Sequence, residues 1–312
     1  MLDSAYIKTV ALEVGFDLCG ITSVRNFNAE QEFFADWLQR GFAGGMEYLA
    51  RNVEKRFSPA VLVPGVKTII VCGVVYKNDT STGYGDSCGV PKIASYARSR
   101  DYHFSVKEML AALAVRITET YGSVAYRTFT DSAPVLEKKL AVEAGLGFIG
   151  RNKLVVSPEK GSFMVLGELF VGVEADCYDA PVLTAGCGSC RRCVDSCPNG
   201  ALTEKGLDAG RCISRLTIEK MPDGDLSGNG PELHGWAFGC DVCQSVCPYN
   251  AASPLFSNCR FSPVFDPRDI TYADWAAMTE PEFESRFAGT PLERAGFERI
   301  RESALRLKSR QG

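Results

Sequence analysis

The sequence lacks several features that usually reveal a function. Among its 312 residues are only two histidines, His103 and His234, which draws attention to both. The longest apolar strand-like run, residues 68–76, is far too short to span a bilayer. The first residues include the acidic Asp3 and no apolar core of a signal peptide, so we expect no secretory leader.

Nucleotide-binding motifs and strong charge are missing as well. No Gly-x-Gly-x-x-Gly motif follows an expected strand and no Walker loop occurs, so binding of a nicotinamide or a nucleotide has no support. The net charge is −4, with a pI near 5.5. A surface built entirely for nucleic acid is therefore excluded, although a local basic patch is compatible with this charge.

Cysteine, in contrast, is abundant, with thirteen residues. Because nothing in the sequence indicates secretion, disulfides are not the favoured use for them. Clustered cysteines in a reducing compartment bind metal or carry out redox chemistry. We therefore expect a soluble cytoplasmic protein with a metal or redox centre.

Two cysteine motifs define that centre. The first is Cys-x2-Cys-x2-Cys-x3-Cys-Pro at 187–198, and the second is Cys-x2-Cys-x3-Cys-Pro at 240–248, with Cys212 upstream. This spacing is typical of two-cluster bacterial ferredoxins, in which the fourth cysteine of a motif binds the other cluster. One [4Fe–4S] cluster is therefore expected on Cys187, Cys190, Cys193 and Cys247, and the second on Cys197, Cys212, Cys240 and Cys243.

Structural zinc is the alternative for these cysteines. Zinc sites favour paired knuckles separated by longer gaps, and four cysteines in eleven residues do not fit that pattern. The remaining cysteines match no ligand spacing, and buried packing is the expectation for the first two of them: Cys19, Cys72, Cys88, Cys177 and Cys259.

The hydrophobic pattern divides the chain into three parts. Helices are expected at 4–14, 30–40, 105–121 and 134–144, and strands near 15–21, 66–76, 153–157 and 163–173. The run at 66–76 is apolar on both faces, which indicates a central strand. We therefore expect an α/β or α+β domain at 1–173, a cysteine-rich domain at 174–262, and a tail at 263–312 with short helices at 271–278, 280–286 and 291–308.

Two further segments carry groups suited to acid–base chemistry. Residues 96–103 gather ionisable and aromatic side chains before a helix, with Tyr102 and His103 at their end. His103 either packs at the helix start or takes part in chemistry. Asp131, between a strand and a helix, is either an N-cap or a general acid, and desolvation would raise the pKa of such an acid.

Several segments together resemble the epoxyqueuosine reductases. The resemblance covers essentially the whole chain and rests on TDSAPVLEKKLAVEAGLGFIGRN at 130–152, CGSCRRCVDSCPNGAL at 187–202, CISRLTIE at 212–219, GWAFGCDVCQSVCPYN at 235–250, EKRFSP at 54–59 and residues 96–103. It implies an α+β fold, in which a cobalamin-binding domain like that of the reductive dehalogenases precedes a two-cluster ferredoxin-like domain and a short helical tail.

The resemblance also implies a reaction and its participants. The epoxide of epoxyqueuosine, at the wobble position of a tRNA anticodon, would be reduced to the alkene of queuosine with base-off cobalamin. An external low-potential donor would supply the electrons, and a monomer is expected. Asp131 corresponds to the proton donor, and the cobalamin contacts fall on Arg56, Ala94, Asp131, Asn152, Val155, Leu166, Ser214 and Asp241.

Contacts to tRNA are the least determined part of the resemblance. Many members have a longer C-terminal region of helical repeats, and this chain is expected to be a short form. Tyr102, His103, Arg215 and Lys220 are candidates for substrate contacts, and Arg191 and Arg192 are additional phosphate candidates. The basic side chains of the tail either contact tRNA phosphates together with these residues or form a solvated helix face. They are Arg294, Arg299, Arg301, Arg306, Lys308 and Arg310.

Two other functions are compatible with these residues. A related enzyme would use the corrinoid and the clusters to reduce a small molecule, such as an organohalide. A protein without catalytic activity would carry electrons or reactivate a corrinoid partner. The Asp131 segment favours an enzyme over an electron carrier.

Overall fold

A four-stranded antiparallel sheet forms the centre of the N-terminal part. The computed structural model describes every residue except 80, 82–83, 85–89, 220–229 and 309–312. The sheet has the order β1-β2-β7-β4, formed by β1 (Leu18–Ser23), β2 (Thr68–Val75), β7 (Met164–Val171) and β4 (Tyr126–Phe129). Every residue of β2 is buried, which confirms the expected central strand. Because all of its pairings are antiparallel, the expected α+β class is confirmed.

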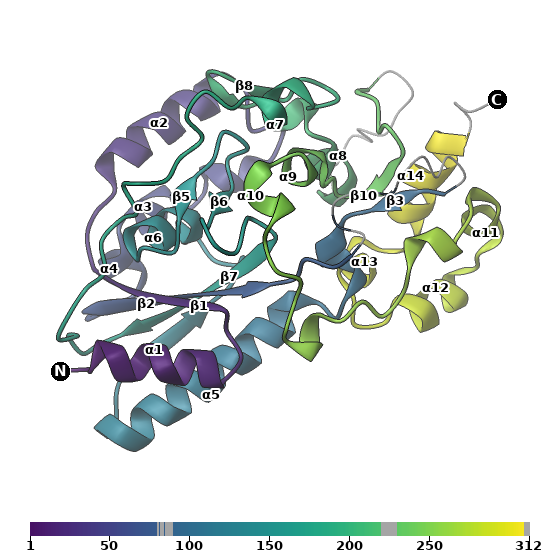
Figure 1. Ribbon diagram of the computed structural model, residues 1–312. Helices are drawn as coiled ribbons and strands as arrows, with labels where there is room; N and C mark the ends of the chain where they lie inside the picture. The colour runs from purple at the N-terminus through teal and green to yellow at the C-terminus, as the bar shows by residue number, and fades with distance from the viewer. Residues whose placement is uncertain (80, 82–83, 85–89, 220–229, 309–312) are drawn as a thin grey trace.

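Two helices cover one face of this sheet (Figure 1). They are α1 (Ser4–Glu13) and α5 (Tyr102–Tyr121). Their apolar residues pack on the even-numbered side chains of β2, Ile70, Cys72 and Val74, which point to this face. Although α5 is the longest helix at 20 residues, no helix in the described part of the chain has the length and hydropathy to cross a membrane.

Other helices cover the opposite face. They are α2 (Asn28–Gln39), α3 (Val53–Phe57), α4 (Pro59–Leu62) and α6 (Glu137–Glu143). Leu140 and Ala141 of α6 pack with Ile69 and Val71, the odd-numbered side chains of β2. The alternation along β2 thus supplies two separate cores, one on each face of the sheet.

The cysteine-rich segment folds into short elements beside this sheet. Its parts are α7 (Arg192–Asp195), β8 (Leu202–Thr203), β9 (Gly206–Leu207), α8 (Ile213–Ile218), β10 (Trp236–Phe238), α9 (Val242–Ser245) and α10 (Pro248–Ala251). β10 pairs in parallel with β3 (Lys92–Ile93), far upstream in the chain. A second small ladder joins β5 (Phe148–Ile149) to β6 (Val155–Val156). The β3–β10 pairing joins the cysteine-rich segment to the segment that leads into α5.

The tail packs as four helices on the β3–β10 pair. They are α11 (Tyr272–Ala277), α12 (Glu280–Phe287), α13 (Pro291–Ala295) and α14 (Phe297–Lys308). The rings of Trp275 and Phe287 stack at 5.4 Å, in a core shared with Phe238 of β10. The expected single helix at 291–308 is wrong, because Gly296 adopts a φ of 88° and ends α13.

Two other helix boundaries differ from the expected ones. α5 begins at Tyr102, three residues early, since the carboxylate of Asp101 accepts a hydrogen bond from the backbone N–H of His103 at 2.9 Å. α6 begins at Glu137, three residues after the expected start, and its N-cap residue Leu136 makes no side-chain capping hydrogen bond. Both shifts lie next to the segments expected to carry acid–base chemistry.

Gly20 in β1 allows α6 to approach the sheet closely. A Cβ at this position would lie 1.9 Å from the carbonyl oxygen of Ala144 and 2.7 Å from Leu146. We expect Gly20→Ala to destabilise the fold by about 1–3 kcal/mol, measured as a fall in the apparent melting temperature. Gly186→Ala is the control, since a Cβ there has no neighbour within 4 Å. Equal melting temperatures for both variants would contradict the close approach.

Candidate active site

Asp131 lies two residues after the end of β4, in a conformation that few side chains adopt. Its φ of 55° is in the left-handed region. Its carboxylate accepts a hydrogen bond from the hydroxyl of Tyr102 at 2.7 Å and lies 3.2 Å from Nε2 of His103. The structure therefore brings together Asp131, Tyr102 and His103, three of the residues selected from the sequence.

A second carboxylate fixes the other side of the imidazole. Oδ1 of the buried Asp101 lies 2.6 Å from Nδ1 of His103. Burial alone would lower the pKa of His103, but hydrogen bonds to Asp101 and Asp131 outweigh burial and raise this pKa above its usual value. His103 is thus positioned between two acceptors that favour its protonated form.

The pKa of Asp131 moves in the opposite direction from the one expected. A hydrogen bond from His103, followed by one from Tyr102, lowers the pKa of Asp131 although burial would raise it. These shifts favour the imidazole over the carboxylate as the site of a shared proton, although the charge of Arg294 acts to lower the pKa of His103. The interpretation of Asp131 as an N-cap is wrong, because the N-cap of α6 is Leu136.

These three side chains form part of the wall of a large cavity, with a volume of about 660 Å³. The opposite parts of the wall come from residues 45–51, the end of α8 and α13 in the tail. Arg294 of α13 lies over His103, with Nη1 2.6 Å from Nδ1 and 2.8 Å from Nε2. The remaining lining residues are Gly45, Met46, Glu47, Tyr48, Arg51, Tyr96, Ile218, Glu219, Phe238, Pro291 and Ala295.

A second cavity, of about 290 Å³, adjoins the first through Tyr96, whose side chain lines both. It contains the four cysteines expected to hold one cluster: Cys197, Cys212, Cys240 and Cys243. Four of the expected cobalamin contacts line the same cavity: Ala94, Asn152, Ser214 and Asp241. Sites expected for two different groups are therefore adjacent.

The other four cysteines surround a third cavity, of about 40 Å³. They are Cys187, Cys190, Cys193 and Cys247, the set expected from crossed ligation. Asn152 lines both the second and the third cavity, and its buried Nδ2 has no hydrogen-bond partner. The three cavities thus form a series linked by Tyr96 and Asn152.

Each group of four thiols surrounds a space and does not converge on one point. In the described residues, no three His, Cys, Asp or Glu side chains are placed to hold a metal ion, whereas each quartet lines a cavity. Burial raises the pKa of the Cys240 thiol to about 12 and that of Cys243 well above its usual value. Such thiols lose their protons when they bind metal, because the cation stabilises the thiolate.

The other expected cobalamin contacts lie near the cavities without lining them. Arg56 has a buried Nε without a hydrogen-bond partner, and its guanidinium lies over the ring of Phe34 at 5.8 Å. Val155 of β6 is buried. The carbonyl of Leu166 in β7 accepts a hydrogen bond from Thr130, at 2.9 Å. The unpartnered donors of Arg56 and Asn152 are consistent with a bound polar group.

The five cysteines outside the quartets are divided by exposure. Cys72 is buried, as expected, while Cys19, directly opposite it in the β1–β2 pair, is only half-buried. Cys177 and Cys259 are exposed, and Cys88 lies outside the described residues.

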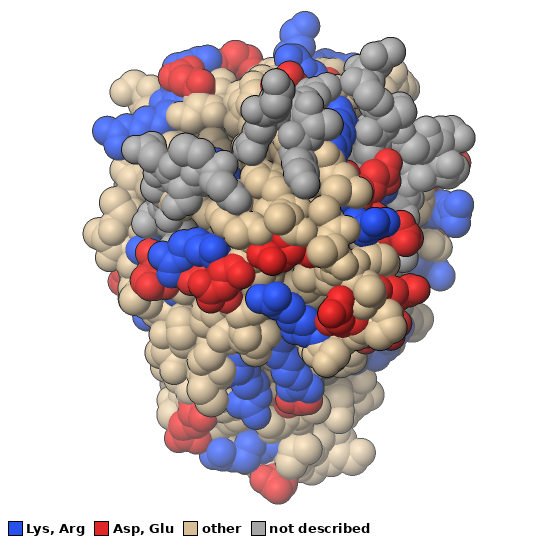
Figure 2. Space-filling view, turned by 90° about the vertical axis from the view of Figure 1, so that its right-hand side faces the viewer, with Lys and Arg blue, Asp and Glu red and all other residues tan. Residues whose placement is uncertain are grey.

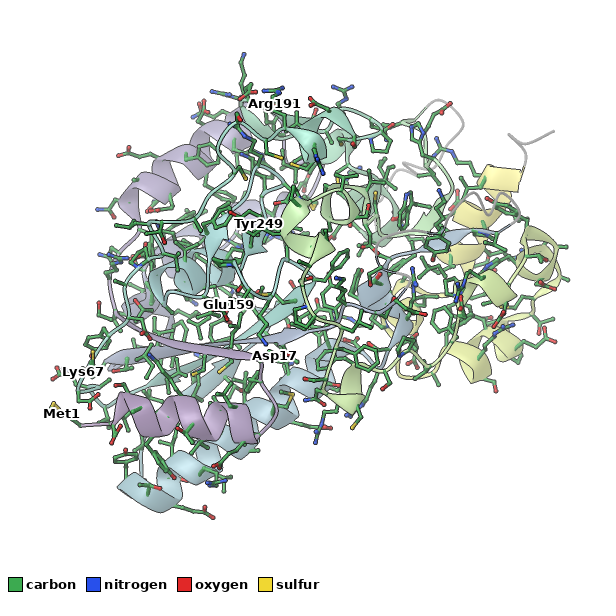
Figure 3. The ribbon with its side chains drawn as sticks, viewed as in Figure 1. Met1, Asp17, Lys67, Glu159, Arg191 and Tyr249 are labelled. Atoms are coloured by element: carbon green, nitrogen blue, oxygen red, sulfur yellow. The ribbon has the colours of Figure 1, made fainter. Side chains whose placement is uncertain are left out.

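The basic residues considered for tRNA contacts are dispersed. Arg215 is nearly buried and donates to the carbonyl of Gly44, while Lys220 lies outside the described residues. Arg191 pairs with Glu204 at the upper edge of the molecule, far from the C-terminal helices (Figure 3). Over these helices, basic and acidic side chains are interspersed (Figure 2).

Two arginines of the basic tail have structural partners. Arg299 donates to the carbonyls of Leu216 and Thr217, and Arg306 donates to those of Gly230 and Pro231. Arg310 lies outside the described residues. Of the tail arginines, Arg294 is the one that lines the large cavity.

Sequence reasoning missed several residues of this site. Tyr48 and Arg51 line the large cavity but belong to a segment without a recognisable motif. Glu137 lies within the segment 130–152, and its carboxylate accepts a hydrogen bond from the backbone N–H of Asp131. Two sequence signals could have identified it: its position six residues after Asp131 and the expected helix start.

Two family models match the chain. The model described as "4Fe-4S double cluster binding domain" matches residues 186–250, which contain all eight quartet cysteines. The model described as "Epoxyqueuosine reductase QueG, DUF1730" matches residues 56–132, which end just after Asp131. The chain thus has a domain that binds two [4Fe–4S] clusters.

Relatives and solved structures agree with these models. The epoxyqueuosine reductase of Cyclobacterium marinum is 37% identical over 94% of this chain and 92% of its own length. A crystal structure of epoxyqueuosine reductase with an epoxyqueuosine-modified tyrosine tRNA stem loop matches with a TM-score of 0.84 and 25% identity, over 97% of this chain and 80% of that one. The Bacillus subtilis enzyme, solved with its catalytic aspartate loop swung out of the active site, matches with the same values. The chain therefore belongs to the epoxyqueuosine reductase family.

Proposed function

We propose that this protein reduces the epoxide of epoxyqueuosine, at the wobble position of tRNA, to the alkene of queuosine. The observation that carries the proposal is the cavity of about 660 Å³, which places Asp131 and His103 beside a second cavity lined by four cysteines. A proton source and an electron source thus meet at one site. Family membership identifies the substrate class, and the tRNA stem loop held by the solved relative supports it.

The reaction consumes two electrons and two protons and releases the epoxide oxygen as water. Asp131 would pass a proton to that oxygen as the C–O bond breaks. Because the lowered pKa of Asp131 favours its ionised form, the proton comes to it from the His103 imidazolium, 3.2 Å away. Asp101 holds the far side of the imidazole and keeps Nε2 directed at Asp131.

Cobalamin is the proposed cofactor for the C–O bond cleavage. When bound, it would supply a strongly reducing, nucleophilic cobalt. Ala94, Asn152, Ser214 and Asp241 would hold it from the second cavity, together with Asp131, and the unpartnered guanidinium Nε of Arg56 would meet its polar groups. Val155 and Leu166 would support it from β6 and β7.

Electrons would arrive through the two clusters in the order of the cavities. Tyr96 lines both the large cavity, which contains Asp131, and the cavity of the Cys243 quartet. Asn152 lines both the cavity of the Cys243 quartet and that of the Cys187 quartet. The Cys187 quartet is therefore the farther of the two from Asp131. An external low-potential donor would therefore reduce the cluster on Cys187, Cys190, Cys193 and Cys247 first.

We further propose a cytoplasmic monomer with domains at 1–173, 174–262 and 263–312.

Guanidinium groups at the cavity are the proposed contacts for the anticodon backbone. Arg51 and Arg294 line the cavity directly, whereas Arg215 would act by holding Gly44 at its edge. Tyr102 and His103 would contact the modified base. The aspartate loop of the Bacillus subtilis relative has a swung-out position. We therefore infer that the Asp131 loop of this chain also moves when substrate enters.

Asp131→Asn is the direct test of the proton donor. With anaerobically reconstituted clusters, added cobalamin and a strong reductant, we expect turnover of epoxyqueuosine-containing tRNA to fall at least about 100-fold. Nucleoside mass spectrometry would follow the loss of one oxygen. The control is Asp36→Asn, an exposed aspartate that pairs with Arg40 on α2. Unchanged turnover in Asp131→Asn would exclude Asp131 as the proton donor. If the wild-type enzyme binds both cofactors but leaves the epoxide intact, the result would point to a small-molecule substrate.

The raised pKa of His103 can be measured directly, because the chain has only one other histidine. We expect the imidazole of His103 to titrate above 6.5 by NMR, and Asp101→Asn to lower its pKa, because the amide that replaces the carboxylate carries no negative charge. His234→Gln would identify the signal of the other histidine, which lies within hydrogen-bond distance of Asn199. A His103 pKa at or below 6.5 in the wild type would contradict the proton assignment.

Crossed ligation is testable by pairs of substitutions. If Cys190 and Cys247 hold the same cluster, Cys190→Ala with Cys247→Ala should retain one cluster, measured as iron and absorbance after reconstitution. If Cys190 and Cys243 hold different clusters, Cys190→Ala with Cys243→Ala should lose both. Cys259→Ala, at an exposed cysteine outside both quartets, should retain both. Loss of both clusters in both double variants would show uncrossed ligation.

A further inference from the structure

A carboxyl group lies buried in the core behind Asp131. Glu168 of β7 is fully buried, and it lies opposite Val71 of β2 and Phe129 of β4 in the sheet register. Neither of its carboxylate oxygens has a hydrogen-bond partner. Burial, followed by the charges of Glu137 and Asp131, raises the pKa of Glu168 well above its usual value. The surroundings of Glu168 therefore favour its neutral form.

Glu137 lies between this buried acid and the Asp131 loop. It is the first residue of α6, and its Oε1 accepts a hydrogen bond from the backbone N–H of Asp131. Burial, followed by the charge of Asp131, raises the pKa of Glu137 to about 7. Two acidic side chains, Glu137 and then Glu168, therefore lie one behind the other next to the Asp131 loop.

The loop needs such a contact because Asp131 adopts a left-handed conformation, which is costly for a residue with a side chain. Two other hydrogen bonds hold its neighbours. Thr130 donates to the carbonyl of Leu166 at 2.9 Å, and the N–H of Ser132 donates to the carbonyl of Thr130 at 2.6 Å. Neither of these bonds restrains the peptide N–H of Asp131, for which Glu137 is the acceptor.

We propose that Glu137 is a positioning residue, which latches the backbone of Asp131 and so keeps its carboxylate aimed at the cavity. The proposal rests on the proposed function, since it assigns Asp131 as the acid. An ionised carboxylate accepts a hydrogen bond more strongly than a neutral one. The latch is therefore stronger above the pKa of Glu137 than below it.

The groups facing Glu137 come from four elements. They are Tyr102 and His103 of α5, Asp131 of the loop, Lys138 of α6 and Glu168 of β7. The positive charges of Lys138 and of protonated His103 favour the ionised form of Glu137, while burial and the charge of Asp131 oppose it. Deprotonation of His103 as the pH rises acts on the same site, so a pH series alone does not isolate the latch.

Two substitutions of Glu137 separate the latch from the charge. Glu137→Gln retains an oxygen that accepts a hydrogen bond, and Glu137→Ala removes it. We expect hydrogen exchange in a peptide that contains Asp131 to become at least about 10-fold faster in Glu137→Ala. In Glu137→Gln, exchange should stay within about 3-fold of the wild type. Turnover should follow the same order, with kcat reduced in Glu137→Ala and the KM for tRNA nearly unchanged.

Glu143→Ala is the matched control on the same helix. Glu143 is buried and pairs with Arg25 and Lys139, so its removal disturbs α6 without touching Asp131. Exchange at Asp131 should remain at the wild-type rate in this control. Equal exchange in Glu137→Ala and the wild type, or in Glu137→Ala and Glu143→Ala, would overturn the latch.

The hydrogen-exchange measurement tests the latch, and the turnover measurement tests the proposed function, so the two proposals can be contradicted separately. If the wild-type protein does not reduce epoxyqueuosine, the exchange comparison still decides whether Glu137 holds the loop. If the enzyme is active and exchange is unchanged by Glu137→Ala, the latch fails while the proposed function stands.

A stability measurement covers the case in which Glu137→Ala does not fold. Because the pKa of Glu137 is raised from 4.5 to about 7, its contribution to stability is complete below about 4.5 and is lost as the pH rises through about 7. We expect the apparent melting temperature of Glu137→Gln to vary less between pH 5 and pH 7 than that of the wild type. The same pH dependence in both proteins would mean that Glu137 is not buried beside Asp131 in solution, and would overturn the latch.

Discussion

The hydrogen bond between Asp131 and His103 is the interaction on which the site depends. It shifts the pKa values of both groups, because each stabilises the charged form of the other, and Asp101 adds to the shift of His103. The two residues come from different elements, one from the loop after β4 and the other from the first turn of α5. Their distance is therefore determined by how α5 packs on the sheet, and the large apolar face of this helix fixes that packing. Acid–base chemistry at the cavity relies on a hydrophobic core that lies away from it.

Much of the molecule could be predicted from its sequence, for physical reasons that differ between regions. The central strand β2 was evident because an apolar run on both faces has few other uses in a soluble domain. The cysteine groups followed from the spacing of the two motifs, because the fourth cysteine of such a motif binds the other cluster. In both cases the information is local, or repeats at a fixed period along the chain.

The unpredicted features depend on contacts between distant segments. The pKa of Asp131 could not be deduced, because its main determinant, His103, is 28 residues away in the chain. Arg294 was noted only as one basic residue of a helix, and its place over His103 depends on how α13 packs. The break at Gly296 is local, but a glycine within an amphipathic pattern is compatible both with a continuous helix and with an end.

The position of Tyr96 between two cavities limits which substitutions the site can accept. Its ring lines the large cavity on one side and the cavity of four cysteines on the other, and it contacts the rings of Tyr76, Tyr102 and Phe238. A substitution here alters the shape of both compartments at once, so substrate fit and redox environment cannot be adjusted separately at this position. Variation that tunes selectivity is consequently easier on the opposite wall, at Tyr48 or Arg51, where a side chain belongs to only one of the two compartments.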